Sequence, residues 1–181
     1  MKSCCKLLTH LSIACFGFFA CKNQSKASRN ELLSGMYKLF SIQVQDSSGI
    51  YHDEWASDGT GYIIYDGLGH MAVHITPKVY KDYKWVLSEN ETLNPENIKS
   101  KMDSMSVDEL KAAVEEFASN YVYVANYSVS DTSDFVIHHR LSHTIPASWN
   151  TTVKRRFIFR GDTLELHNDA DKRRLIWIKE K

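Results

Sequence analysis

Residues 121–143 read YVYVANYSVSDTSDFVIHHRLSH, a stretch typical of a β-hairpin. Two apolar-rich runs, 121–130 and 135–142, flank the polar turn residues at 131–134. Along the first run, larger apolar residues alternate with other residues, as they do in a strand with one face toward a core. Short runs of this kind, separated by a cluster of turn residues, predict antiparallel strands. The stretch therefore predicts two paired strands in an all-β chain.

The same pattern continues in both directions along the chain. Turns that contain glycine at 66–69 and 161–162 join two further pairs of runs, because glycine adopts the positive φ that tight turns require. The predicted strands are 36–45, 61–65, 70–76, 121–130, 135–142, 152–160, 163–167 and 173–179. Eight antiparallel strands are a usual number for a barrel that holds side chains or one small ligand. The predicted fold class is therefore an all-β, eight-stranded antiparallel barrel.

One α-helix is predicted between the third and fourth of these strands. Ser106 and Glu109 have the spacing of a capping box, with the acidic residue three positions after the cap. An apolar stripe follows at steps of three and four, comprising Val107, Leu110, Val114, Phe117 and Tyr121. We expect the helix to end near Asn120 and to cover one mouth or one flank of the barrel. Segment 78–105 is long for a loop, which favours a lid or additional local structure.

The first 21 residues have the layout of an export signal. Basic residues precede an apolar run at 7–20, which is too short to cross a bilayer core of about 30 Å. The run ends at Ala20-Cys21, a small residue before a cysteine, which resembles the cleavage site of a bacterial lipoprotein. Cys15 offers a rival site, but cleavage there would leave the apolar residues 16–19 on the mature chain. The predicted lipidation site is therefore Cys21.

This leader defines the expected organisation of the chain. We expect a lipoprotein signal peptide at 1–21, a flexible polar tether at 22–31 and one barrel domain at 32–181. Several acyl chains on one cysteine anchor a protein stably, whereas a single chain binds a membrane only marginally. Lys22 stands where enteric bacteria place an acidic retention signal, which favours an outer-membrane position in the cell envelope. The alternatives are an ordinary secretory signal cut near Ala20 and a leader that is retained.

Composition and motifs argue against several classes of function. Lysine plus arginine and aspartate plus glutamate number 22 each, so charge provides no reason to expect a nucleic-acid partner. All four cysteines lie within the first 21 residues, so we expect no disulfide, thiolate metal site or catalytic cysteine in the folded domain. His70 and His74 would share a strand face about 13 Å apart, too far to chelate one metal ion. No Gly-x-Ser-x-Gly motif is present. We therefore assign no catalytic residue, metal site or cofactor, and the oligomeric state stays open.

Alternation along the strands gives a provisional inner face for the barrel. In 135–142 the apolar residues share a face with His139, which predicts that His139 points inward and His138 outward. Trp149, in the loop before the sixth predicted strand, is expected at the mouth. The predicted ligand-binding residues are Tyr65, Tyr123, Tyr127, His139, Trp149, Arg155 and Phe157. A mainly aromatic cavity with a few polar groups suits a small, largely apolar molecule with one acidic or carbonyl group.

As a set, these segments resemble the bacterial lipocalin-like domain family over about residues 32–179. The resemblance rests on LSGMYKLFS at 33–41, GYIIYD at 61–66 with GHM at 69–71, YVANY at 123–127, IHH at 137–139, RRF at 155–157, GDTL at 161–164 and LIW at 175–177. Tyr37 stands where the family usually has tryptophan, and Ala125 where it usually has glycine. The resemblance implies a lipocalin-like barrel with an internal cavity, and together with the predicted lipidation of Cys21 it indicates a lipocalin-like lipoprotein. It implies no single activity, because some similar barrels bind small apolar molecules and others steer cyclisations.

Three functions stay open on the sequence alone. The first is a lipid-anchored module that binds a small apolar or amphipathic ligand. The second is an enzyme for isomerisation, cyclisation or ester chemistry, with His139 or a tyrosine as acid or base and Arg155 stabilising negative charge. The third is a structural or interaction barrel that side chains fill. An open cavity would argue against the third function, and the enzyme requires His139 and Arg155 to converge on one point.

Overall fold

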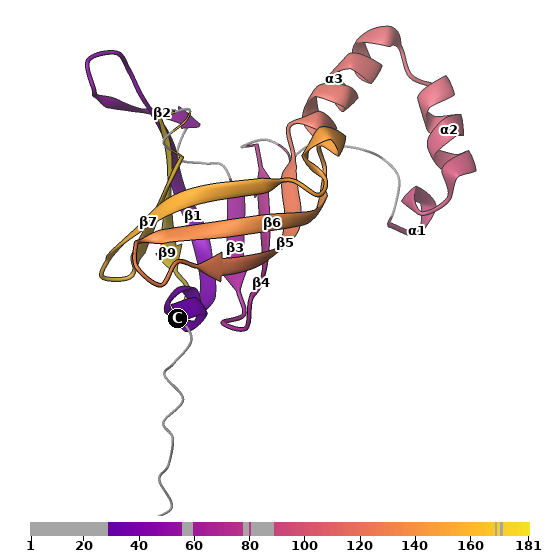
Figure 1. Ribbon diagram of the computed structural model, residues 1–181. Helices are drawn as coiled ribbons and strands as arrows, with labels where there is room; N and C mark the ends of the chain where they lie inside the picture. Colours follow the sequence, from indigo (N-terminus) through magenta and orange to yellow (C-terminus); the bar gives the residue numbers. More distant parts are fainter. Residues whose placement is uncertain (1–28, 56–59, 78–79, 81–88, 169, 171) are drawn as a thin grey trace, which may run out of the picture.

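A computed structural model describes residues 29–55, 60–77, 80, 89–168, 170 and 172–181. Figure 1 shows a barrel of strands with a group of helices projecting from it. The elements are η1 (Arg29–Leu33), β1 (Gly35–Gln45), β2 (Tyr51–Trp55), β3 (Thr60–Tyr65), β4 (His70–Thr76), α1 (Glu89–Thr92), α2 (Pro95–Asp103), α3 (Val107–Ala118), β5 (Tyr121–Val129), β6 (Phe135–His143), η3 (Pro146–Ser148), β7 (Thr152–Arg160), β8 (Thr163–Asn168) and β9 (Arg173–Lys179).

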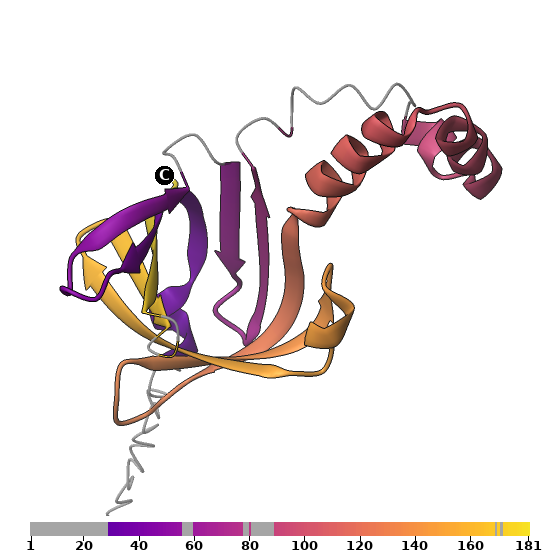
Figure 2. The same cartoon turned by 90° about the horizontal axis from the view of Figure 1, so that it is seen from above.

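The strands form one antiparallel sheet that closes on itself. Neighbours follow the order β2-β1-β3-β4-β5-β6-β7-β8-β9, and β1 also pairs with β9. The first half of β1 pairs with β3, whereas its second half pairs with the short strand β2. Strands β1 and β3–β9 therefore make an eight-stranded barrel (Figure 2). The short strand β2 is additional and, among the described residues, pairs with β1 alone. The predicted all-β barrel is confirmed.

The eight predicted strands all appear, and their ends lie within one residue of the predicted ends. Strand β2 is an addition, because its five residues are mostly polar and carry no apolar alternation. Because β2 comes before the helix, four strands rather than three precede it, and the predicted helix lies between β4 and β5 instead of between the third and fourth strands. The prediction of a single helix is also wrong, because two further helices, α1 and α2, precede α3. Both lie within segment 78–105, for which we expected a lid or additional local structure.

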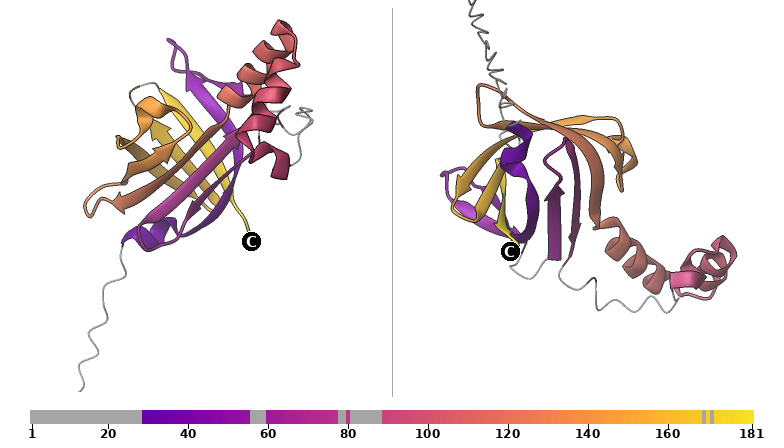
Figure 3. Two further views of the ribbon diagram at one scale, coloured as in Figure 1. Left: turned by 90° about the vertical axis from the view of Figure 1, so that its right-hand side faces the viewer. Right: turned by 90° about the horizontal axis from the view of Figure 1, so that it is seen from below.

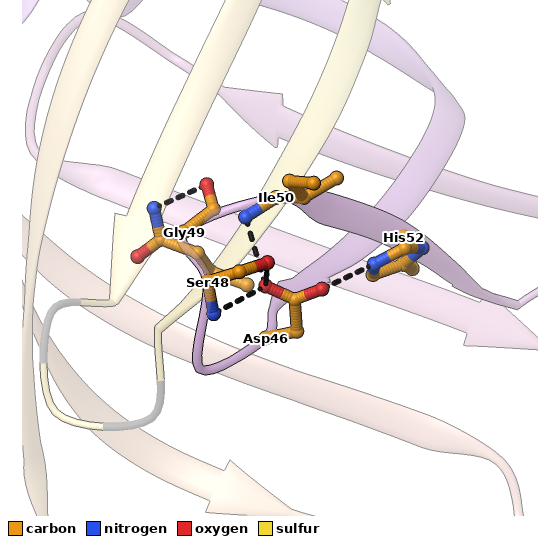
Figure 4. Close-up of polar contacts among 6 residues, drawn as sticks. Asp46, Ser48, Gly49, Ile50 and His52 are labelled. Carbon is orange, nitrogen blue, oxygen red and sulfur yellow. Dashed lines mark hydrogen bonds and ion pairs between the residues drawn. The ribbon is translucent and has the colours of Figure 1, made fainter.

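A network around Asp46 forms the turn between β1 and β2 (Figure 4). Its carboxylate accepts hydrogen bonds from the backbone N–H groups of Ser48 and Ile50, both at 2.9 Å, and from the Ser48 hydroxyl at 2.6 Å. The His52 ring lies 2.6 Å from the second carboxylate oxygen. The bonds from Ser48 and His52 lower the pKa of Asp46. Gly49, with a φ of 87°, allows the chain to reverse here.

The end of the barrel beside η1 is closed by large side chains. Leu33, Tyr37 and Trp177 are fully or almost fully buried. The Tyr37 hydroxyl donates to the Leu33 carbonyl at 3.1 Å, which holds η1 to the first strand. The chain ends at this same end, because the backbone N–H of Glu180 donates to the Met36 carbonyl at 2.9 Å (Figure 3). We call this the closed end and the opposite end the mouth.

The three α-helices form an arm that projects from the barrel beside its mouth (Figures 1 and 2). Only Ser119 and Asn120 separate α3 from β5, and α3 extends outward from the start of this strand (Figure 2). The predicted apolar stripe consequently stays largely exposed, with Val107 at 66 % and Val114 at 64 %. The expectation that this helix covers the barrel is therefore wrong. No helix in the described ranges has the length and apolar composition needed to cross a membrane.

The predicted capping box at the start of α3 is present, and it allows a test of the arm. The Glu109 backbone N–H donates to the Ser106 hydroxyl at 3.3 Å, and the Ser106 backbone N–H donates to the Glu109 carboxylate at 2.7 Å. We expect Ser106→Ala to destabilise α3 locally by about 1 kcal/mol, the usual loss for such a cap. Amide hydrogen exchange should then accelerate in α3 and stay unchanged in the barrel.

The matched control is Glu109→Gln, because glutamine also serves in a capping box. Exchange in α3 should rise less in this variant than in Ser106→Ala. Equal exchange of the α3 amides in Ser106→Ala and in the unaltered protein would show that the cap does not stabilise the arm.

Candidate functional site

The pairing of β6 with β5 determines which histidines enter the barrel, because His138 lies opposite the buried Tyr127 and a bulge further along the strand turns His143 inward as well. Val124 lies opposite Ser142 and Ala125 lies opposite Arg140, so Leu141 is an extra residue without a partner on β5. A bulge reverses the inward and outward alternation at that point. His138 and His143 are both buried, whereas His139 is exposed. The predicted orientation is therefore wrong, because it took the apolar Phe135 and Ile137 as the inner face, whereas both are only partly buried and the fully buried Val136 shares the inner face with His138.

His138 is the centre of a cluster of polar side chains inside the barrel, together with Tyr65 and Tyr123. It is 0 % exposed, and its Nε2 lies 3.0 Å from the Tyr65 hydroxyl while its Nδ1 lies 2.8 Å from the Tyr123 hydroxyl. A neutral imidazole has one donor and one acceptor nitrogen. One tyrosine therefore donates to the ring and the other accepts from it, and both ring nitrogens are satisfied.

All three of these groups stay uncharged near neutral pH. Burial, reinforced by the nearby Arg155 charge, lowers the pKa of His138 to about 3. Burial also raises the pKa of Tyr65 and of Tyr123. A general acid or base works best when its pKa is close to the operating pH. The enzyme hypothesis thus loses its histidine, since His139 lies outside the barrel and His138 is held neutral.

A cavity of about 260 Å³ opens at the mouth of the barrel. Four apolar side chains from different parts of the fold contribute to its wall, namely Ile42, Ile75, Ile145 and Leu175. The segment 118–121, where α3 passes into β5, and the side chain of Arg155 complete much of the lining. The side chains are therefore packed at the closed end, while the mouth retains space for a small molecule.

Two polar side chains of this cavity are buried and incompletely bonded. Arg155 and Asn120 are each 9 % exposed. Within the described ranges, Arg155 Nη1 and Asn120 Oδ1 have no hydrogen-bond partner. At the rim, Glu54 accepts two hydrogen bonds from Arg173, at 2.6 and 2.7 Å. The carboxylate in the cavity wall is thus neutralised by Arg173.

Of the seven predicted ligand-binding residues, Arg155 lines this cavity. Tyr65 and Tyr123 do point into the barrel, but their hydroxyls bond His138. Tyr127 is buried at the closed end, where its hydroxyl donates to the Asn30 carbonyl at 2.9 Å. Phe157 is part of the packed core. The inward orientations of the tyrosines, Arg155 and Phe157 are confirmed, whereas contact with a ligand stays a prediction.

The other two predicted residues lie outside the barrel interior. Trp149 is 52 % exposed beside η3, and its indole N–H donates to the His143 carbonyl at 2.6 Å. His139 Nδ1 lies 3.2 Å from the Thr152 hydroxyl on the outer surface. The structure therefore brings Arg155 together with residues that the sequence analysis did not select.

The chief residue missed is Asn120. It lies at the junction of the predicted helix and the next predicted strand. A junction of this kind necessarily lies at one end of a barrel, and that position was the available signal. The pattern did not show which end of the barrel the junction occupies or which strands it adjoins.

Fold and cavity together define a class of protein, a single-domain β-barrel with a small cavity at one mouth. Comparison with family models identifies residues 34–179 as a lipocalin-like domain. The chain therefore belongs to the lipocalin-like domain family, as the resemblance implied, and this barrel fold is one that binds ligands in general. Comparisons with curated proteins and with solved structures found no match.

Proposed function

We propose that this protein is a lipid-anchored binding module that holds a small apolar or amphipathic molecule at the mouth of its barrel. The observation that carries the proposal is the cavity, whose wall combines apolar side chains with polar ones that include the buried Arg155. Sites for small molecules usually combine apolar walls with a few convergent polar groups. A completely filled barrel would leave no such space, so the cavity favours binding over a purely structural role.

The size of the cavity limits the ligand. Pockets for drug-sized ligands usually measure about 300–1,000 Å³. A cavity of about 260 Å³ lies just below that range. The inner part of the barrel offers little additional room, because Trp177, Tyr65 and His138 are fully buried there. We infer a ligand smaller than most drugs, with an apolar part that contacts the isoleucine and leucine wall.

Native mass spectrometry of the full chain, extracted in a non-ionic detergent, tests the binding proposal. We expect a co-purifying small molecule on the unaltered protein. Ala118→Trp places a large ring at the cavity lining and should remove that mass. Ala112→Trp adds the same ring to an exposed part of α3 outside the cavity and should retain it.

Two results would contradict this proposal. One is an empty protein that also shows no thermal shift with a panel of lipids and metabolites. The other is equal retention of the bound molecule in both tryptophan variants, which would place binding elsewhere on the chain.

The sequence supports attachment of the chain to a membrane through Cys21. Seven residues, 22–28, separate this cysteine from η1, and about 3.3–3.6 Å per residue gives them a reach of about 25 Å. Residues 29–31 of the predicted tether are part of η1. Because η1 lies at the closed end, an anchor at Cys21 would direct the mouth away from the membrane surface (Figure 3).

Metabolic labelling with an alkyne fatty acid tests the anchor. We expect label and membrane association in the unaltered protein and in Cys15→Ser, and the loss of both in Cys21→Ser. Labelling of Cys21→Ser together with loss from Cys15→Ser would assign the anchor to Cys15 and overturn the proposal.

A further inference from the structure

The two unsatisfied polar atoms of the mouth cavity differ in kind. Arg155 Nη1 is a hydrogen-bond donor on a charged group, and Asn120 Oδ1 is an acceptor on a neutral amide. Buried polar groups without partners are rare in folded proteins, and each needs an explanation. Both residues line the same cavity and each is nine-tenths buried. A single ligand could therefore satisfy both atoms.

The orientation of the Asn120 amide follows from its hydrogen bonds. Its Nδ2 donates to the Glu116 carbonyl at 3.0 Å and to the Phe117 carbonyl at 3.4 Å. Carbonyl oxygens only accept hydrogen bonds, so the nitrogen has to face the last turn of α3. The amide oxygen consequently stays without a partner and requires a donor. A hydroxyl group on a ligand would supply one.

Arg155 carries a charge that its surroundings do not balance. No carboxylate within the described part of the chain forms an ion pair with it, and Glu54 is bound by Arg173. The Arg155 charge acts on His138, Tyr65 and Tyr123, and these three groups are neutral, because His138 is held unprotonated and burial raises the pKa of Tyr65 and Tyr123. A buried charge is costly unless it is paired, so an anion in the cavity would be stabilised strongly. Arginine and a carboxylate form some of the strongest hydrogen bonds in proteins.

We propose that the mouth cavity selects a small hydroxy-carboxylate with an apolar chain. The carboxylate accepts from Arg155 Nη1, a hydroxyl of the same molecule donates to Asn120 Oδ1, and the chain contacts the apolar wall. This inference rests on the proposed binding function and specifies its ligand class. An uncharged lipid would leave the Arg155 charge buried and unbalanced, and a simple fatty acid would leave Asn120 Oδ1 without a donor.

Isothermal titration of the full chain with four probes tests the inference: 2-hydroxyoctanoate, 3-hydroxyoctanoate, octanoate and 1-octanol. We expect octanoate to bind at least tenfold more tightly than 1-octanol, since hydrogen bonds to charged groups correspond to roughly a tenfold to hundredfold gain. At least one hydroxy acid should exceed octanoate by about threefold to tenfold, the effect of one neutral hydrogen bond.

Two variants assign these gains to residues. Arg155→Met should remove the preference for octanoate over 1-octanol, and Asn120→Ala should remove the preference for the hydroxy acid over octanoate. Each preference is a ratio between two ligands in the same variant, so a general loss of stability cancels. Arg155→Gln, which retains a hydrogen-bond donor, provides a second neutral variant if Arg155→Met does not fold.

The outcomes separate this inference from the proposed function. Equal affinity for octanoate and 1-octanol, unchanged in Arg155→Met, would overturn carboxylate recognition and leave a binding module for apolar molecules. A hydroxy-acid preference that persists in Asn120→Ala would overturn the role of Asn120. Failure of all four probes to bind, combined with an empty protein in native mass spectrometry, would overturn the binding function itself.

Discussion

Trp177→Ala is expected to lower the free energy of unfolding by about 3–5 kcal/mol, the range found for large-to-small changes at buried aromatic residues. Trp177 is 0 % exposed and belongs to the hydrophobic core. It lies on β9 opposite Leu39 of β1 and Leu164 of β8, so its ring packs at the seam where the barrel closes. Urea denaturation followed by circular dichroism measures the change as a shift of the midpoint.

Two further variants make this test specific. Trp177→Phe keeps an aromatic ring and removes an indole N–H that has no partner within the described ranges, so it should cost less than half as much. Trp149→Ala removes a half-exposed tryptophan outside the barrel and should shift the midpoint only slightly. A loss below about 1 kcal/mol for Trp177→Ala would contradict the central place of this ring in the core.

Stability should also fall as the pH decreases from 7 to 5, because of His138. The histidine takes up a proton near pH 6.5 in the unfolded chain but only near pH 3 in the folded barrel. Between these values the unfolded state binds more protons, so acid favours unfolding. The loss approaches 1.4 kcal/mol per pH unit below 6.5, or about 2 kcal/mol between pH 7 and pH 5.

His138→Gln is the matched control for this pH dependence. Glutamine supplies one donor and one acceptor group to the two tyrosine hydroxyls but takes up no proton in this range. Denaturation midpoints of this variant should therefore depend less on pH than those of the unaltered protein. The pKa of His143 is lowered as well, by burial and by Arg140, so a remaining slope is expected. Identical slopes in the two proteins would show that His138 is not held neutral.

The order and ends of the barrel strands could be predicted because they depend on local chemistry. Alternating apolar residues and turns with Gly67, Gly69 and Gly161 are visible within a few residues of sequence, and all three glycines have positive φ. The capping box of α3 is local in the same way. Strand β2 escaped prediction because its pairing with β1, rather than its own polar sequence, makes it a strand.

The candidate site was harder to predict, because its geometry depends on contacts between distant residues. Pairing with β5 places Val136 and His138 on the inner face of β6, and a bulge at Leu141, also defined by that pairing, brings His143 inward after them. Arg155 was identified from alternation along β7, which contains no such irregularity in the described pairings. Asn120 becomes part of the site only because the barrel brings the end of α3 beside Arg155 and Leu175.

The sequence by itself therefore determined the class of fold, the positions of its eight barrel strands, and the inward direction of Tyr65, Tyr123 and Arg155. These features follow from periodicity and turn residues, which act over a few positions along the chain. Tertiary structure alone decided that His138 rather than His139 enters the barrel, that the helical arm projects away from it, and that the cavity lies at the mouth. Strand pairing and the volumes of side chains from distant segments determine these features, and neither is written in any single stretch of sequence.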